Sequence, residues 1–116
     1  MNKKQIRIQF RMAVFERDGY QCRKCGCPGK DRQGGDGWTK FHKIEPDAFL
    51  DAHHISPREL MPAGGYSIFN GISLCDGCHV KAEQYLQGVI VTGFAPNDLF
   101  ELIGSSLDEA FKNCSQ

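Results

Sequence analysis

The stretches Cys22-Arg23-Lys24-Cys25 and Cys75-Asp76-Gly77-Cys78 decide the fold of this chain. In each stretch two residues separate the cysteines, a spacing that lets both thiolates of one turn reach the same ion. A single pair of this kind could also be a redox site, but two pairs complete the tetrahedral four-sulfur set that is typical of structural zinc. The sequence therefore predicts one structural zinc ion held by Cys22, Cys25, Cys75 and Cys78.

Two further cysteines lie outside these pairs. Cys27 could replace Cys25 as a ligand, although the two-residue spacing favours Cys25. Cys114 lies near the C-terminus and is predicted to be a free thiol. The zinc site would close the long segment between the two pairs, so the free energy of metal binding would contribute to folding.

Length and composition narrow the class of protein. The 116 residues are enough for one domain and too few for two ordinary ones. The sequence contains no recognisable secretory signal and no apolar run of transmembrane length, so we expect a soluble, cytoplasmic protein without a membrane partner. In a reducing compartment, clustered cysteines favour metal binding over disulfides.

The charges are distributed unevenly along a chain whose net charge is zero. Residues 1–43 carry eleven Lys or Arg against four Asp or Glu, a balance of +7, and residues 44–116 carry three against ten, a balance of −7. A basic half suits the phosphate backbone of a nucleic acid, while a solvated basic surface explains the same pattern equally well.

The pattern of apolar residues, prolines and glycines predicts an α+β fold. We expect a helix over residues 5–18, a loop over 28–37, and a hairpin or irregular segment over 38–50. A strand over 49–56, a loop over 58–67 and a return segment over 68–74 precede a helix that starts near Cys78 and ends before Gly88. Two short helices, over 97–103 and 106–113, complete the chain.

Three histidines stand where chemistry could occur. His53 and His54 are adjacent on the predicted strand, so their side chains should point to opposite faces, and unless the strand bends only one of them could face a given metal ion. His79 directly follows the second cysteine pair, so the zinc site would fix its backbone. A metal ligand or a general base needs such fixed placement.

At this point the chain resembles a known family. The run DAHHISP at residues 51–57, then Asn70, then CDGCH at residues 75–79, resembles the motif of the HNH (His-Asn-His) endonucleases. The run VFERDGYQCRKCG at residues 14–26 resembles the lead-in of its zinc-containing members. The resemblance covers about residues 10–86, and it implies a small ββα-metal core with a four-cysteine structural zinc site, flanked by N- and C-terminal helices. Residues 1–116 would form one HNH endonuclease domain, with a C-terminal helical tail at 88–116.

The resemblance also implies a role for each matching residue. His54 would be the general base that activates water, and His53 and His79 would hold a catalytic divalent metal ion, Mg²⁺ or Mn²⁺. Asn70 would brace the loop and help to orient the base. Glu83, one helical turn after His79, occupies a position at which some members place a further ligand. The implied function is metal-dependent endonuclease cleavage of DNA in a bacterial or phage-encoded protein.

Two other classes of protein compete with this hypothesis. The first is a non-catalytic, zinc-dependent DNA-binding module, which needs neither the two adjacent histidines nor His79. The second is a protein-interaction domain stabilised by zinc, which leaves the basic charge of residues 1–43 unexplained. The tail is expected to pack against the core, and a role in a homodimer is the alternative for it.

Overall fold

The computed structural model describes residues 1–114, and its first element is a capped helix. In α1, Lys3–Arg17, the side chain of Asn2 accepts a hydrogen bond of 2.8 Å from the Gln5 backbone, and the Gln5 side chain accepts one of 3.1 Å in return. This reciprocal cap satisfies two backbone donors that a helix start leaves open. The helix begins two residues earlier than predicted and buries one apolar face, formed by Phe10, Val14 and Phe15.

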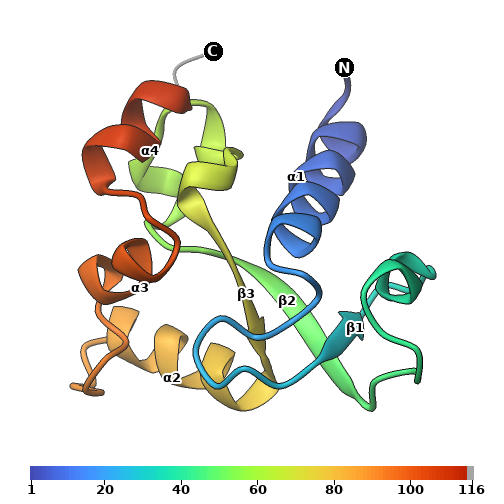
Figure 1. Ribbon diagram of the computed structural model, residues 1–116. Helices are drawn as coiled ribbons and strands as arrows, with labels where there is room; N and C mark the ends of the chain where they lie inside the picture. Colours follow the sequence, from blue (N-terminus) through green and yellow to red (C-terminus); the bar gives the residue numbers. More distant parts are fainter. Residues whose placement is uncertain (115–116) are drawn as a thin grey trace.

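The sheet has three strands in the order β1–β2–β3 (Figure 1). The central strand β2, Ala48–His54, pairs antiparallel with β3, Gly71–Cys75, through its residues Leu50–His54. The short strand β1, Gly29–Asp31, runs parallel to β2 and pairs only with Ala48–Leu50. The edge of β2 from Asp51 to His54 is therefore paired on one side only among the described residues.

The predicted order of strand, loop, strand and helix is confirmed. Helix α2, Asp76–Leu86, follows β3 without a linker, and it starts two residues before the predicted position. The return segment differs from the prediction, because residues 68–70 form a 3-10 turn and the strand begins only at Gly71. The prediction of a loop over residues 28–37 is wrong at β1, which is too short to show a periodic pattern.

Two helices pack against β2 and β3. In Figure 1, α1 lies above these strands and α2 lies below them. The core between the elements includes Leu50, Ile72 and Leu74, which are fully buried. Close packing of α1 requires Gly71, because a Cβ atom there would lie 2.6 Å from Val14 and 2.7 Å from Phe10.

The segment between β1 and β2 is irregular and not a hairpin. It contains the 3-10 helix Gly37–Lys40 and is attached to the end of α1. Lys40 forms an ion pair of 2.9 Å with Glu16, and the His42 ring lies 2.9 Å from the carbonyl oxygen of Tyr20. The loop between β2 and β3 likewise consists of short 3-10 turns, at Arg58–Leu60 and Pro62–Gly65.

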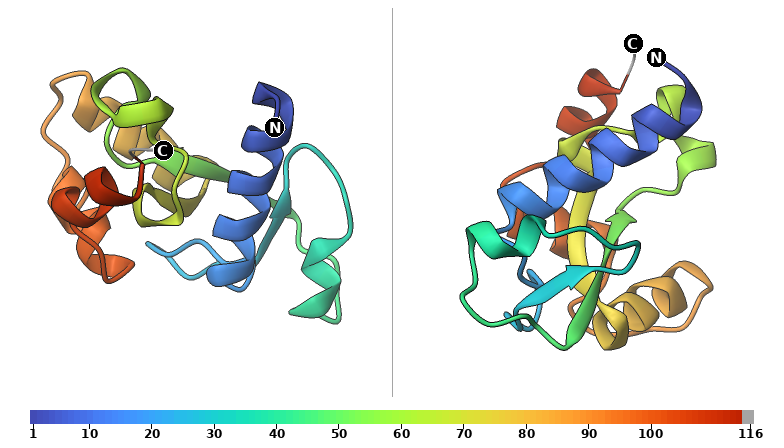
Figure 2. Two further views of the ribbon diagram at one scale, coloured as in Figure 1. Left: turned by 90° about the horizontal axis from the view of Figure 1, so that it is seen from above. Right: turned by 90° about the vertical axis from the view of Figure 1, so that its right-hand side faces the viewer.

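The C-terminal tail packs against the core, as expected. It forms α3, Pro96–Leu102, and α4, Leu107–Asn113, and it buries Leu99, Phe100 and Ala110 in the same cluster as Phe15. The predicted helix start at Ser106 is confirmed, since its side chain accepts a hydrogen bond of 3.1 Å from the Glu109 backbone. The start of α1 and the end of α4 lie at the same end of the molecule (Figures 1 and 2).

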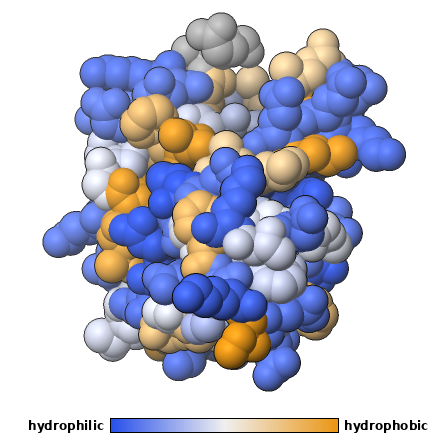
Figure 3. Space-filling model, turned by 45° about the vertical axis from the view of Figure 1, so that its right-hand side comes forward, coloured by the Kyte–Doolittle hydropathy of each residue, from blue (hydrophilic) through white to orange (hydrophobic). Residues whose placement is uncertain are grey.

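In residues 1–114 no helix has the length and apolar character that crossing a bilayer would need. Figure 3 shows a face that is mostly hydrophilic, on which apolar residues form small separate groups. The structure is thus the predicted α+β fold, with a parallel edge strand added to it.

Candidate metal centres and nucleic-acid groove

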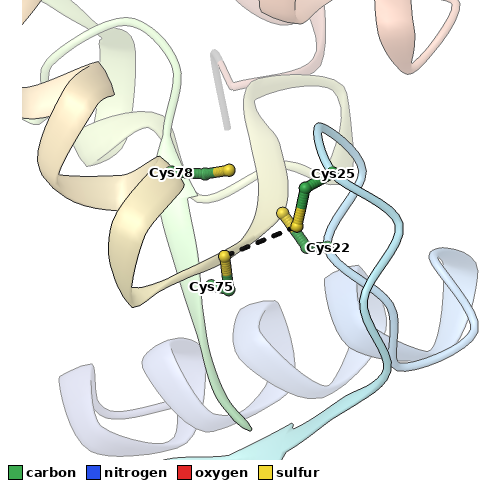
Figure 4. Close-up of side chains that lie close together, drawn as sticks. All are labelled: Cys22, Cys25, Cys75 and Cys78. Carbon is green, nitrogen blue, oxygen red and sulfur yellow. Dashed lines mark hydrogen bonds between the residues drawn. The ribbon is translucent and has the colours of Figure 1, made fainter.

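The four cysteines predicted to bind metal lie close together. Cys22 and Cys25 come from the turn that follows α1, and Cys75 and Cys78 from the end of β3 and the first turn of α2. Figure 4 shows the four side chains converging on one point. All four sulfur atoms lie within 4.8 Å of one another, and those of Cys25 and Cys75 are 3.7 Å apart.

These distances match the geometry of a tetrahedral metal site. A metal–sulfur bond of about 2.3 Å places two sulfurs of a tetrahedron about 3.8 Å apart. The first turn is held by a hydrogen bond of 2.8 Å from the Gly26 backbone to the Cys22 carbonyl oxygen, and Gly26 has a φ of 82°. Because that conformation strains residues with a Cβ atom, the glycine lets the turn present both cysteines to the same side.

Cys27 lies beside the four-cysteine site without belonging to it. Burial, with a contribution from the neighbouring Cys25, raises the pKa of the Cys27 thiol to about 12. The structure thus groups Cys25, and not Cys27, with the other three. Cys114 is buried in the tail, far along the chain from both pairs.

His53 and His54 lie on opposite faces of β2, as the alternation of strand side chains requires. His53 faces α2, where its ring centroid is 5.1 Å from that of His79. His54 faces α1, where its ring stacks on Phe10 with 4.6 Å between centroids. One strand therefore supplies a histidine to each side of the sheet.

His53, His79 and Glu83 form a second group that could hold a metal ion. One ligand atom from each lies within 4.8 Å of the others. Oε1 of Glu83 is 3.4 Å from Nδ1 of His53 and 3.2 Å from Nε2 of His79. His79 and Glu83 are one turn apart on α2, so the helix presents them on one face. The position that the sequence marked as a further ligand is thus beside both histidines.

The protonation of this group follows from burial and from its neighbours. His53 is 4% exposed, and burial, with His79 adding to it, lowers its pKa to about 3, so the ring is neutral near pH 7. A hydrogen bond with Asp51 raises the pKa of His79. The same bond is the main cause that lowers the pKa of Asp51 to about 2.

The general-base candidate, His54, sits between two aromatic rings. Phe10 stacks on it at an interplanar angle of 27°, and Tyr66 meets it edge-on, with centroids 4.9 Å apart. Burial, with the nearby Arg58 cation adding to it, lowers the pKa of His54 to about 4. A neutral imidazole can accept a proton, which is what a general base requires.

A groove gives access to both groups of residues from the uncovered edge of β2. Two adjoining hollows, of about 250 and 470 Å³, share Ala52, His54, Arg58 and His79 in their walls. The first extends between α1 and the end of β1, and the second reaches His53 and Glu83. A molecule in this groove would meet His54 and the second metal-ligand group at the same time.

Basic and aromatic side chains line the α1 side of the groove. Arg58 donates a hydrogen bond of 2.6 Å to the Tyr66 hydroxyl. Although burial opposes it, hydrogen bonds from Arg7 and Arg58 lower the pKa of Tyr66. Lys3, one turn before Arg7 on α1, lines the adjoining hollow together with Arg58 and Tyr66. The sequence pattern gave no reason to place Arg58, Tyr66 or Phe10 here, because they come from separate segments of the chain.

Asn70 braces the loop that carries Arg58 and Tyr66. Its side chain is fully buried, accepts a hydrogen bond of 2.9 Å from the Ser56 backbone, and donates to the carbonyl oxygens of Ser56 and Gly65 at 3.1 and 3.3 Å. These bonds join the two ends of the loop. Within residues 1–114 no hydrogen bond links Asn70 to the three histidines, so any effect on them passes through the backbone.

Internal ion pairs neutralise more than half of the Lys and Arg side chains in residues 1–43. Six of its eleven cations have carboxylate partners: Arg11, Arg17, Arg23, Lys30, Arg32 and Lys40. Asp18 shows how such pairs serve the fold, since it is buried, contacts two arginines, and accepts a bond of 2.9 Å from the Ser73 backbone. The charge imbalance between the two halves therefore overstates the cations that remain for a partner.

Comparison with known proteins identifies the family. A family model described as HNH endonuclease matches residues 22–84, more than half of the chain. This segment contains both cysteine pairs, the three histidines, Asn70 and Glu83. No match was found among curated proteins or among solved structures. The residues matched and the geometry they form agree with the resemblance seen in the sequence, and the chain belongs to the HNH endonuclease family.

Proposed function

We propose that this protein is a metal-dependent DNA endonuclease that hydrolyses phosphodiester bonds with His54 as its general base. Membership of the HNH family indicates a nuclease or a nucleic-acid-binding function. The observation that favours the nuclease is the shared groove, in which His54 and the group His53, His79 and Glu83 are reached from one opening. A module that only bound DNA would need no such convergence.

The second group of residues fits a divalent metal ion. Two imidazoles and a carboxylate offer three ligand atoms within 4.8 Å, and three protein ligands leave coordination positions for water and substrate. A bound divalent ion would stabilise the negative charge that develops on the scissile phosphate and the departing 3′ oxygen. His53 and His79 would hold it, and Glu83 would complete the set.

The chain's own residues would do the remaining work. His54, neutral and held between Phe10 and Tyr66, would take the proton from the attacking water. Arg58 and Arg7 would contact phosphate oxygens at the mouth of the groove, where Tyr66 orients both. Asn70 would keep the loop that carries Arg58 and Tyr66 closed over His54.

We further propose that the four-cysteine site holds one structural zinc ion. Thiolates are preferred zinc ligands, and four of them form a closed site with no position for substrate. The sulfur spacing supports this assignment. The zinc would fasten the turn after α1 to the junction of β3 and α2, and so would fix the start of the helix that carries His79.

Incubation of supercoiled plasmid with the purified, zinc-loaded protein tests the function. We expect relaxed or linear DNA when Mg²⁺ or Mn²⁺ is added and no cleavage after chelation of the added ion. His54→Ala serves as the matched control for a contaminating nuclease. A parent protein that binds DNA but leaves plasmid intact with every divalent ion tried would instead make it a non-catalytic DNA-binding module.

A further inference from the structure

We propose that Asp51 is a positioning residue, which turns the His79 ring so that Nε2 faces the proposed catalytic metal, and that Arg32 holds Asp51 in place. This inference rests on the proposed metal site of His53, His79 and Glu83. Asp51 precedes His53 by two residues on β2 and therefore projects from the same face of the strand. Its Oδ2 atom lies 3.3 Å from Nδ1 of His79.

The contact with Asp51 determines which ring nitrogen of His79 can bind a metal. An ionised carboxylate only accepts hydrogen bonds, so it favours the His79 tautomer in which Nδ1 carries the proton. The lone pair is then on Nε2, which lies 3.2 Å from Glu83 Oε1 and on the side of His53. A carboxylate behind the ring in this way both orients a histidine ligand and increases its basicity.

The contact between His79 and Glu83 favours a cation on the Nε2 side of the His79 ring. With Nδ1 protonated, Nε2 of His79 and Oε1 of Glu83 are two acceptors 3.2 Å apart, and they repel each other. Nδ1 of His53 lies 3.4 Å from the same Glu83 oxygen. A divalent cation among these three atoms turns the repulsion into coordination.

Arg32 fixes Asp51 from the opposite side. Its Nε and Nη2 atoms lie 3.0 and 3.1 Å from the two Asp51 oxygens, a paired contact that lysine cannot reproduce. The same guanidinium also contacts Asp76 in the first turn of α2. It thus joins the end of β1, the middle of β2 and the start of the helix that carries His79. The Arg32 side chain is 43% exposed, so we assign it an orienting effect and little effect on stability.

The charge of Arg32 would suggest a role other than holding Asp51 in place. Because Arg32 lines the groove, its guanidinium could instead contact a DNA phosphate. The Arg32 guanidinium, however, already contacts two carboxylates, whereas Arg7 and Arg58 bond to the neutral Tyr66 hydroxyl. A phosphate role would appear in DNA affinity and its salt dependence, and a positioning role would appear in metal affinity without DNA.

Metal binding without DNA provides the first test. Mn²⁺ is titrated into zinc-loaded protein, and the bound ion is followed by electron paramagnetic resonance. We expect Asp51→Ala to weaken Mn²⁺ binding by about 10- to 100-fold, the usual effect of losing such a carboxylate. Asp51→Asn should retain more affinity, since its amide oxygen can still accept the hydrogen bond. Arg32→Ala should weaken binding less than Asp51→Ala.

Two controls separate positioning from damage to the fold. Lys30→Ala removes a comparable ion pair, with Glu45, from the neighbouring strand and should leave Mn²⁺ affinity unchanged. In a His79→Ala background, Asp51→Ala should add no further loss, because its effect passes through that ring. Zinc content and thermal midpoint should match the parent's in every Asp51 and Arg32 variant. Equal Mn²⁺ affinity in the parent and Asp51→Ala overturns the proposal.

The tautomer of His79 gives a second readout that needs no catalytic metal. Nitrogen-15 shifts of the ring, recorded under alkaline conditions without Mn²⁺, should report a proton on Nδ1 in the parent and a loss of that preference in Asp51→Ala. An unchanged tautomer overturns the positioning role even if the protein cleaves DNA. A changed tautomer and weaker Mn²⁺ binding support it even if no DNA is cleaved, so its outcome is separable from that of the nuclease function.

Discussion

The two candidate metal groups meet at adjacent residues, but they differ in their ligand types and in the elements that supply the ligands. Cys78 belongs to one and His79 to the other, yet the cysteine site takes four sulfurs from two turns, while the histidine site takes three ligands from β2 and α2. Four cysteines would complete the coordination of the proposed zinc ion, whereas the histidine group opens onto a groove. A single peptide bond of α2, between Cys78 and His79, thus separates a site suited to holding the fold from a site suited to chemistry.

The largest effect should come from breaking the cysteine site. Cys78→Ser removes a buried thiol of the proposed zinc site, and we expect the variant to bind no zinc and fail to fold. Structural zinc contributes about 10–16 kcal/mol in small zinc-finger peptides, which compares with a total stability of about 5–15 kcal/mol for a typical domain. Elemental analysis and circular dichroism measure the outcome.

Cys27→Ser is the matched control, because it changes a neighbouring thiol outside the group of four. It should keep both zinc and fold. Folded, soluble and zinc-free Cys78→Ser protein would remove the distinction between the two sites.

A smaller effect, confined to rate, should come from the histidine groove. His54→Ala should slow plasmid cleavage by about a hundredfold or more, the usual contribution of a general base, while zinc content and folding stay intact. His79→Ala should also slow cleavage, but through weaker metal binding, so a higher Mn²⁺ concentration should partly restore it.

The rescue experiment decides between these two roles. His54→Ala should not respond to added Mn²⁺, because a proton acceptor is missing and not a ligand. If both variants are rescued equally, His54 acts through the metal and the assignment of the base is wrong.

The next effect in size is a partial loss of stability, expected when Asn70 is replaced. Asn70→Ala leaves the Ser56 and Gly65 backbone groups without their buried partners, at a cost of about 1–3 kcal/mol for each unsatisfied group. Chemical denaturation measures the loss, and cleavage should fall because Arg58 and Tyr66 are no longer held. Asn113→Ala, which removes an exposed bond to the Glu109 carbonyl oxygen, is the control. A parent-like denaturation midpoint would contradict the bracing role.

The smallest effect should be seen in DNA affinity. Arg58→Ala and Arg7→Ala should each weaken binding severalfold and reduce the slope of log affinity against log salt by about one phosphate contact, roughly 0.9 for duplex DNA. Lys40→Ala removes an equal charge that is paired with Glu16, and it should change binding less. Equal losses in all three variants, measured by fluorescence anisotropy at several salt concentrations, would show that net charge alone governs affinity.

The sequence predicted the parts of the site that depend on local spacing. Two residues between cysteines, two adjacent histidines on a strand, and one helical turn between His79 and Glu83 each restrict geometry within a few residues. For that reason the four-cysteine group and the order of strand, loop, strand and helix were predictable.

What the sequence could not predict depends on contacts between distant segments. The three residues of β1 carry no periodic signal, and they pair in parallel with a segment that lies well beyond them in the sequence. The contacts of Asp51 with Arg32 and His79 span 19 and 28 residues, and no spacing rule connects them. Likewise, the +7 balance of residues 1–43 did not reveal that most of those cations would be consumed by internal carboxylates.

The point at which β1 stops has a consequence for the length of the open edge of β2. After Asp31 the chain reverses, because the Asp31 carboxylate accepts a bond of 2.8 Å from the Gln33 backbone while it also pairs with Arg11. Had β1 continued for two more residues in the same register, it would have covered the backbone of β2 beside Asp51 and Ala52. Asp31 thus ends the growth of the sheet at this edge, and the length of a three-residue strand sets how much of the neighbouring strand would be open to the proposed nucleic-acid substrate.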